Sequence, residues 1–71
     1  MKAIIEGIYV EDVTILGKWE GLGLMVDWSC PAKNVKPLEL LKVQQAGFTF
    51  HIKGDTCYIT SRRPYTQFVE E

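Results

Sequence analysis

The chain has 71 residues, so it has room for one hydrophobic core and not for two. Its formal net charge of -1 gives no overall field that would attract nucleic acid or an anionic membrane. The apolar share of 46% is that of an ordinary globular protein. We therefore expect one domain over residues 1–71, in which any electrostatic targeting comes from local clusters of charge.

The N-terminal segment predicts a strand over residues 3–10. Apolar side chains occupy both parities of this segment, as in strands that are covered on both faces or that form an interface. Glu6 interrupts the apolar run, and no small-residue cleavage site follows it, so the segment lacks the features of an export signal. A cytoplasmic location is the resulting expectation.

Residues 13–28 predict a hairpin with a two-residue loop at Glu20-Gly21, because glycine adopts the positive φ that such loops need. Strands over 13–19 and 22–28 then carry one apolar face and one polar face. The expected apolar pairs are Trp19 with Leu22, Gly17 with Leu24, Ile15 with Val26 and Val13 with Trp28. The opposite face pairs Lys18 with Gly23, Leu16 with Met25 and Thr14 with Asp27.

A second hairpin is predicted over residues 48–53 and 56–61, where Gly54 suits the first central position of a type II′ turn. This register also separates an apolar face from a mixed one. The apolar pairs are Ile52 with Cys57 and Phe50 with Ile59. The mixed pairs are His51 with Tyr58 and Thr49 with Thr60.

A helix over residues 37–46 is predicted between the two hairpins, with Pro37 in its first turn and Gly47 after its last. The fold class is therefore α+β: a small antiparallel sheet in the order strand, strand, strand, helix, strand, strand. We expect the helix to pack on the apolar face and to cover Trp19, Trp28, Phe48 and Phe50. The tail over 62–71 contains Phe68 and Val69, which suggest that it is partly held by the domain.

Two cysteines, Cys30 and Cys57, lie too far apart in sequence for a zinc motif built from close pairs. In a reducing cytosol they are expected to be small buried apolar residues. A disulfide is the alternative, if the protein is exported or handled in air.

Catalytic groups are scarce in this chain. His51 is its one histidine, and in the predicted register it lies on the face opposite Cys57, so the two cannot form a nucleophile and base. No nucleotide-binding or nucleophile-elbow motif is present, and no cofactor or metal site is predicted. A small enzyme or enzyme subunit that uses His51 is the third hypothesis for function.

The first hypothesis is a non-catalytic module that binds another protein of unknown identity. The apolar surface predicted to remain exposed, which is typical of interfaces, includes Leu16, Met25, Leu38 and Val43. A homodimer is one way to cover it. Compact proteins without catalytic groups are common among inhibitors, adaptors and other regulators of viruses, phages and mobile elements, and by this association we expect a regulator of that type.

The second hypothesis is single-stranded nucleic-acid binding by the mixed face of the second hairpin. Aromatic side chains on a sheet face, flanked by cations, can stack unpaired bases. The residues concerned are His51, Lys53, Tyr58, Arg62, Arg63 and Tyr65. The small number of cations in a slightly acidic chain favours the protein-binding hypothesis.

Overall fold

The computed structural model describes residues 1–19, 24–44 and 47–70, except for the side chains of Trp19 and Val43. Its strands are β1 (Lys2–Ile5), β2 (Ile8–Val10), β3 (Thr14–Trp19), β4 (Met25–Pro31), β5 (Thr49–Lys53), β6 (Thr56–Arg62) and β7 (Thr66–Val69). The helical segments are the short helix α1 (Pro37–Val43) and the 3₁₀ turns η1 (Ala32–Asn34) and η3 (Arg63–Tyr65). The described residues thus form a sheet-rich α+β structure with one α-helix.

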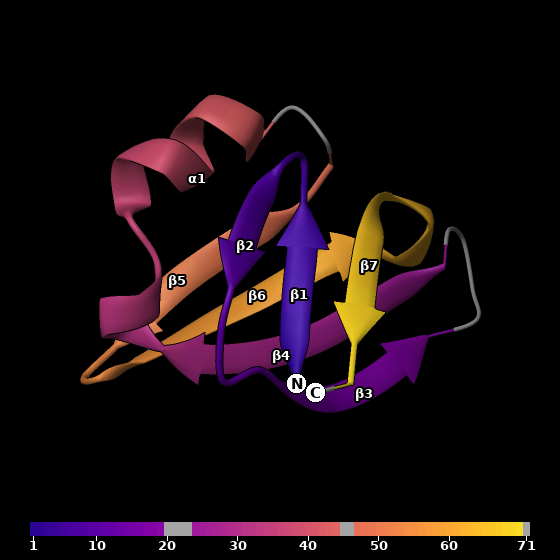
Figure 1. Cartoon of the computed structure of the whole chain (residues 1–71), viewed down its shortest axis with the longest axis horizontal. Coiled ribbons are helices and arrows are strands. Elements are labelled where there is room, and N and C mark those ends of the chain that lie inside the picture. Colours follow the sequence, from indigo (N-terminus) through magenta and orange to yellow (C-terminus); the bar gives the residue numbers. More distant parts are fainter. Residues whose placement is uncertain (20–23, 45–46, 71) are drawn as a thin grey trace.

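The strands form two antiparallel sheets. One has the order β2-β1-β7, and the other has the order β3-β4-β6-β5. Figure 1 shows the three-stranded sheet lying across the four-stranded sheet, with the strands of the two layers crossing. Such a two-layer arrangement gives a core between the sheets, to which alternate residues of each strand contribute.

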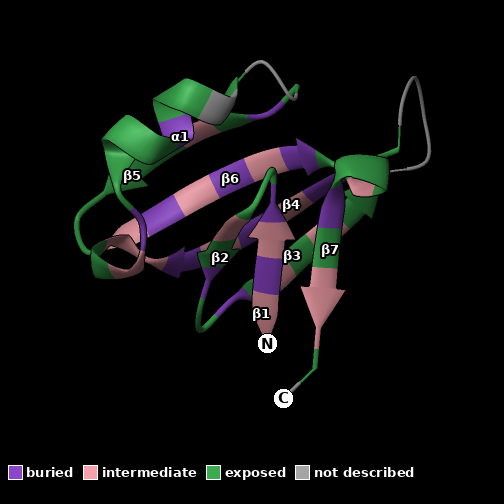
Figure 2. Ribbon diagram, turned by 45° about the horizontal axis from the view of Figure 1, so that its top comes forward, coloured by how far each residue is buried: buried purple, intermediate pink, exposed green. Residues whose placement is uncertain are grey.

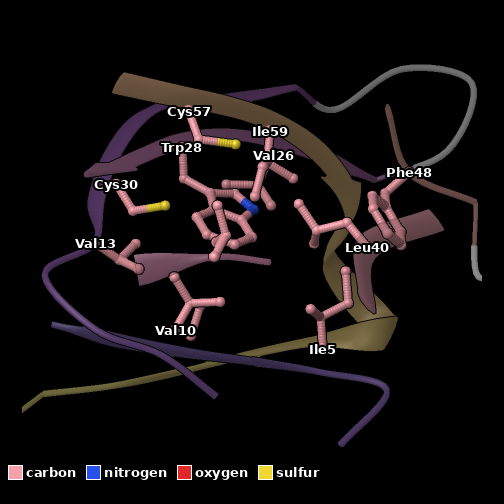
Figure 3. Packing of buried hydrophobic residues seen from close by; sticks show 12 residues of the cluster. Ile5, Val10, Val13, Val26, Trp28, Cys30, Leu40, Phe48, Cys57 and Ile59 are labelled. Carbon is pink, nitrogen blue, oxygen red and sulfur yellow. The ribbon is translucent and has the colours of Figure 1, made fainter. Parts of the chain in front are cut away.

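The core follows this alternation closely. In β4 and β6, every second side chain is buried, and the intervening ones are half-buried or exposed. Figure 2 shows these alternating bands of burial along the strands. Figure 3 shows buried side chains of both layers pointing toward each other. The buried apolar set is Ala3, Ile5, Val10, Val13, Val26, Trp28, Cys30, Val35, Leu40, Phe48, Cys57 and Ile59.

The prediction that the helix covers the whole apolar face is too specific. The three-stranded sheet, not α1, covers the apolar face of the four-stranded sheet, and α1 lies at its β5 side (Figures 1 and 2). Leu40 is fully buried, whereas Leu38 and Leu41 are exposed. The helix ends at Val43, short of the predicted end, and Gln45 and Ala46 lie outside the described residues. Within the described ranges, no helix is long and apolar enough to cross a membrane.

The predicted strand over residues 3–10 is in fact two strands. β1 and β2 pair around Glu6 and Gly7, which have φ values of 49° and 82°. Positive φ at both central residues is characteristic of a type I′ turn, whose twist matches that of the flanking strands. The segment that has apolar residues at both odd and even positions is therefore a hairpin of the three-stranded sheet.

The predicted register of the first hairpin is wrong. Trp19 pairs with Met25 and not with Leu22, so the strands are joined by more than the two residues of a tight turn, and the predicted turn at Glu20 and Gly21 lies outside the described residues. The register also shifts between Ile15 and Gly17, where Leu16 is the extra residue of a β-bulge. Sequence alternation alone does not reveal a bulge, because one inserted residue reverses the parity that follows it.

The predicted register of the second hairpin is confirmed. Phe50 pairs with Ile59, His51 with Tyr58 and Ile52 with Cys57. Gly54 has a φ of 62°, as a turn of this kind requires. The C-terminal tail is held by the domain, as expected, because β7 pairs along β1.

A buried polar network joins the two sheets. The indole Nε1–H of Trp28 donates to Ser61 Oγ over 2.9 Å, and Ser61 Oγ lies 2.8 Å from Thr66 Oγ1. Thr66 Oγ1 is also 3.0 Å from the carbonyl oxygen of Arg62. If Thr66 donates to that carbonyl, Ser61 can donate to Thr66, and all three side-chain donors are satisfied. Trp28 also contacts Phe68 edge to face, with ring centroids 6.0 Å apart.

We predict that Ser61→Ala lowers the free energy of unfolding by about 1–3 kcal/mol, because it leaves the buried Trp28 N–H without an acceptor. Urea denaturation measures the change. Ser29→Ala is the matched control, since Ser29 lies in β4 with its side chain directed away from the core. The control should change stability by less than about 0.5 kcal/mol. Equal effects of the two substitutions would contradict a role for the network.

We predict that Glu6→Asn raises the free energy of unfolding by up to about 1 kcal/mol, because asparagine tolerates the left-handed backbone better than glutamate does. Glu6→Gln removes the same charge without relieving the backbone and should leave stability unchanged. Thermal unfolding of both variants separates the two causes. An increase with glutamine equal to that with asparagine would assign the effect to charge.

Candidate functional site

The outward face of the four-stranded sheet is the candidate site, and we call it the open face. Among the described elements, no helix or strand lies over it, since α1 and the other sheet lie elsewhere (Figures 1 and 2). Its side chains are exposed or half-buried. They are Leu16, Met25, Asp27, Ser29, Thr49, His51, Lys53, Thr56, Tyr58, Thr60 and Arg62.

The pairing of β4 with β6 assembles this face, because it joins the two hairpins along their inner strands. Asp27 pairs with Thr60, and Ser29 pairs with Tyr58, so the polar rows of both hairpins become continuous. His51 extends the second row from β5. Residues that are more than 30 positions apart in sequence thereby share one surface.

A hollow of about 170 Å³ lies on the open face. The rings of His51 and Tyr58 stack at one side of it, with centroids 5.2 Å apart and planes inclined by 17°. Leu16, the bulge residue, is 55% exposed and contributes an apolar wall. The lining residues are Leu16, Asp27, Trp28, His51, Tyr58, Ile59 and Thr60.

Asp27 and Thr60 form the polar part of the hollow. The Thr60 hydroxyl donates to Asp27 Oδ1 across β4 and β6. We predicted that each of these residues lies on the outward face of its own hairpin. The predicted pair of Thr60 with Thr49 is confirmed, whereas Asp27 pairs with Gly17 and not with Thr14. No local signal indicates which strands of two separate hairpins will pair, so this contact could not be predicted.

The residues predicted to bind a protein do not all lie together. Leu16 lines the hollow, whereas Met25, which precedes Asp27 on the same face, pairs with Trp19 and Arg62 and not with Leu16. Leu38 is 73% exposed on α1, at the β5 side of the sheet. The side chain of Val43 is not among the described parts of the structure.

The residues proposed for nucleic acid are also divided. The open face includes His51, Lys53, Tyr58 and Arg62. The Arg62 side chain lies against Gly47, because a Cβ atom added to that glycine would be 3.0 Å from Arg62 Nε. Arg63 begins η3 and donates its backbone N–H to the carbonyl of Leu24. The open face therefore combines cations with Asp27 and is not uniformly basic.

Tyr65 lies at a separate, wider hollow of about 470 Å³ on the outer side of β1 and β7. Its lining residues are Ile4, Glu6, Pro64, Tyr65, Thr66 and Gln67. The larger volume reflects its more open shape, and it lacks the stacked rings of the open face. We therefore take the smaller hollow as the better candidate for specific binding.

The geometry limits the chemistry that these side chains can perform. His51 is exposed on the open face, whereas Cys57 is fully buried in the core, so the expected separation of imidazole and thiol is confirmed. Within the described ranges, no group of three or more His, Cys, Asp and Glu side chains is placed to hold a metal ion.

Both thiols are free and buried. Burial raises the pKa of Cys30 from 9.0 to about 12, and the neighbouring Cys57 adds to the increase. Burial also raises the pKa of Cys57, against a smaller opposite effect of its hydrogen bond with Cys30. Both groups are therefore neutral thiols near pH 7, and a protonated buried thiol is a poor nucleophile.

Comparisons with protein-family models, curated proteins and solved structures found no match to this chain.

We predict that stability falls as pH rises above 9.0, the ordinary pKa of the thiols. A raised pKa in the folded state stabilises the protein fully below the unfolded value, and this contribution is lost as pH rises toward about 12. Each thiol adds up to about 1.4 kcal/mol per pH unit to the decline. Urea denaturation on both sides of pH 9.0 measures it. The double variant Cys30→Ala, Cys57→Ala should show a shallower decline, and an equal slope would contradict this assignment.

Proposed function

We propose that this chain is a non-catalytic module that binds another protein through its open face, as a small inhibitor or adaptor of a larger assembly in the cytoplasm. The observation that carries the proposal is an uncovered sheet face with a side-chain-sized hollow, bordered by Leu16 and by the His51 and Tyr58 rings. Aromatic side chains with apolar neighbours are enriched among the residues that dominate binding energy in interfaces.

The shape and chemistry of the hollow favour one inserted side chain from the partner. Leu16 and Tyr58 offer apolar surface, and the Thr60 and Asp27 pair offers polar contacts at the same place. A central apolar anchor with a polar border is the usual arrangement of a binding hot spot. The mixed charge of the face favours a protein over the phosphate backbone of a nucleic acid.

Site-specific photocrosslinking tests the proposal. A photoreactive phenylalanine analogue replaces Leu16 in one protein and Gln67, an exposed residue of β7, in the control. We expect a discrete crosslinked polypeptide from position 16 and none from position 67. Tyr58→Ala should then weaken binding of the identified partner by about 30-fold, as for a hot-spot residue. Gln67→Ala should leave the affinity unchanged.

Three other results would contradict the proposal. Crosslinked species that nuclease destroys would favour the nucleic-acid hypothesis, and Arg62→Ala would then reduce their salt-dependent binding. A product of twice the chain mass would show that a second copy occupies the face. An activity that disappears with His51→Ala would favour the enzyme hypothesis.

A further inference from the structure

Cys30 and Cys57 form a matched pair across the two central strands of the four-stranded sheet. They are direct partners in the register of β4 and β6, and they are 3% and 0% exposed. Figure 3 shows both side chains pointing into the core beside Trp28. The two thiols are close enough for each to affect the pKa of the other.

The backbone hydrogen bonds define which kind of antiparallel pair this is. The N–H of Ala32 donates to the carbonyl of Asp55 over 2.7 Å, so these two residues form a hydrogen-bonded pair. Such pairs recur at every second position, which makes Cys30 and Cys57 a hydrogen-bonded pair as well. Pro31, which has no N–H, occupies the intervening non-hydrogen-bonded position opposite Thr56.

This geometry permits a disulfide but strains it. The Cα atoms of a hydrogen-bonded pair are about 5.5 Å apart, within the range that disulfides span. The Cβ atoms are also about 5.5 Å apart, whereas a relaxed disulfide brings them within about 4.5 Å. Closing the bond must therefore draw β4 and β6 together at this point. A strained disulfide is more easily reduced than a relaxed one.

We propose that Cys30 and Cys57 form a reversible, easily reduced disulfide when the protein meets a low-molecular-weight disulfide such as oxidised glutathione. In a transient opening of the sheet, one cysteine thiolate attacks the reagent and releases one glutathione thiol. The second cysteine then displaces the other glutathione from the mixed disulfide. The protein loses two hydrogen atoms overall, and one glutathione disulfide becomes two thiols.

The bond would alter the open face from beneath. Ser29 precedes Cys30, Tyr58 follows Cys57, and these two neighbours are themselves paired on the open face. The approach of β4 and β6 changes the separation of Ser29 and Tyr58, and with it the surroundings of the ring that stacks on His51. The disulfide would form whether or not a protein binds at that face, so its test is independent of the proposed function.

Equilibration of the whole protein in glutathione buffers of different ratios, followed by intact mass measurement, tests the proposal. We expect a species lighter by two hydrogen atoms, and amide NMR shifts at Ser29, Tyr58 and His51 on oxidation. Cys30→Ser and Cys57→Ser should each prevent this species. Failure of the wild-type protein to lose two hydrogen atoms at any glutathione ratio would overturn the proposal.

A matched control moves the cysteine pair by one residue along β4 and β6. The variant Cys30→Ser, Cys57→Ser, Ser29→Cys, Tyr58→Cys places two thiols at the adjacent non-hydrogen-bonded pair, where Cβ atoms are closer. Circular dichroism of its reduced form verifies the fold. We expect the wild-type disulfide to have an equilibrium constant for reduction at least about tenfold larger than the control. Equal constants, or a wild-type bond that is harder to reduce, would overturn the strained geometry.

Discussion

The hydrogen bond from the Trp28 indole to Ser61 is the contact on which the packing of the two sheets depends. It joins the inward side chains of β4 and β6, and Ser61 in turn contacts Thr66 at the start of β7. The turn η3 carries the chain from one layer to the other between these two hydroxyl residues. Because an indole N–H buried without an acceptor is costly, any other placement of β7 would lose part of this network. The pairing of β7 with β1 then positions the three-stranded sheet.

The same constraint determines which side chains reach the open face. Ser61 must face inward to accept from Trp28, and the alternation of the strand then directs Thr60 and Tyr58 outward. A slip by one residue would bury Tyr58 and Asp27 and expose Trp28, which the core cannot tolerate. The surface that we propose for binding is thus a consequence of core packing, and its residues lie on the strands of the four-stranded sheet and not on loops.

Local signals in the sequence predicted some parts of this structure and not others. The second hairpin was predictable because its local signals agree on one register. The turn at Gly54 and the alternating apolar positions of Phe50, Ile52 and Ile59 all require the same pairing. The first hairpin was not, because its bulge at Leu16 reverses the parity of the residues that follow it.

The N-terminal turn was missed for a different reason. Glutamate is uncommon where Glu6 adopts positive φ, so Glu6-Gly7 lacked the usual asparagine or aspartate signal. The apolar residues at both odd and even positions were then attributed to a single strand, either covered on both faces or part of an interface. The open face shows the same limit: its residues were placed on the right faces of their hairpins, but the pairing of β4 with β6 is a long-range choice that no short segment encodes. The position of the helix depends on the pairing of β4 with β6 as well.

The bulge at Leu16 has a further effect on the behaviour of the molecule in concentrated solution. β3 ends the order of its sheet, and the outer edge of such a strand can serve as a template for a strand from another molecule. An extra residue breaks the regular spacing of N–H and C=O groups along that edge, so an incoming strand cannot form a continuous ladder. The bulge that places Leu16 at the hollow therefore also makes β3 a poor template for pairing with a strand of another molecule.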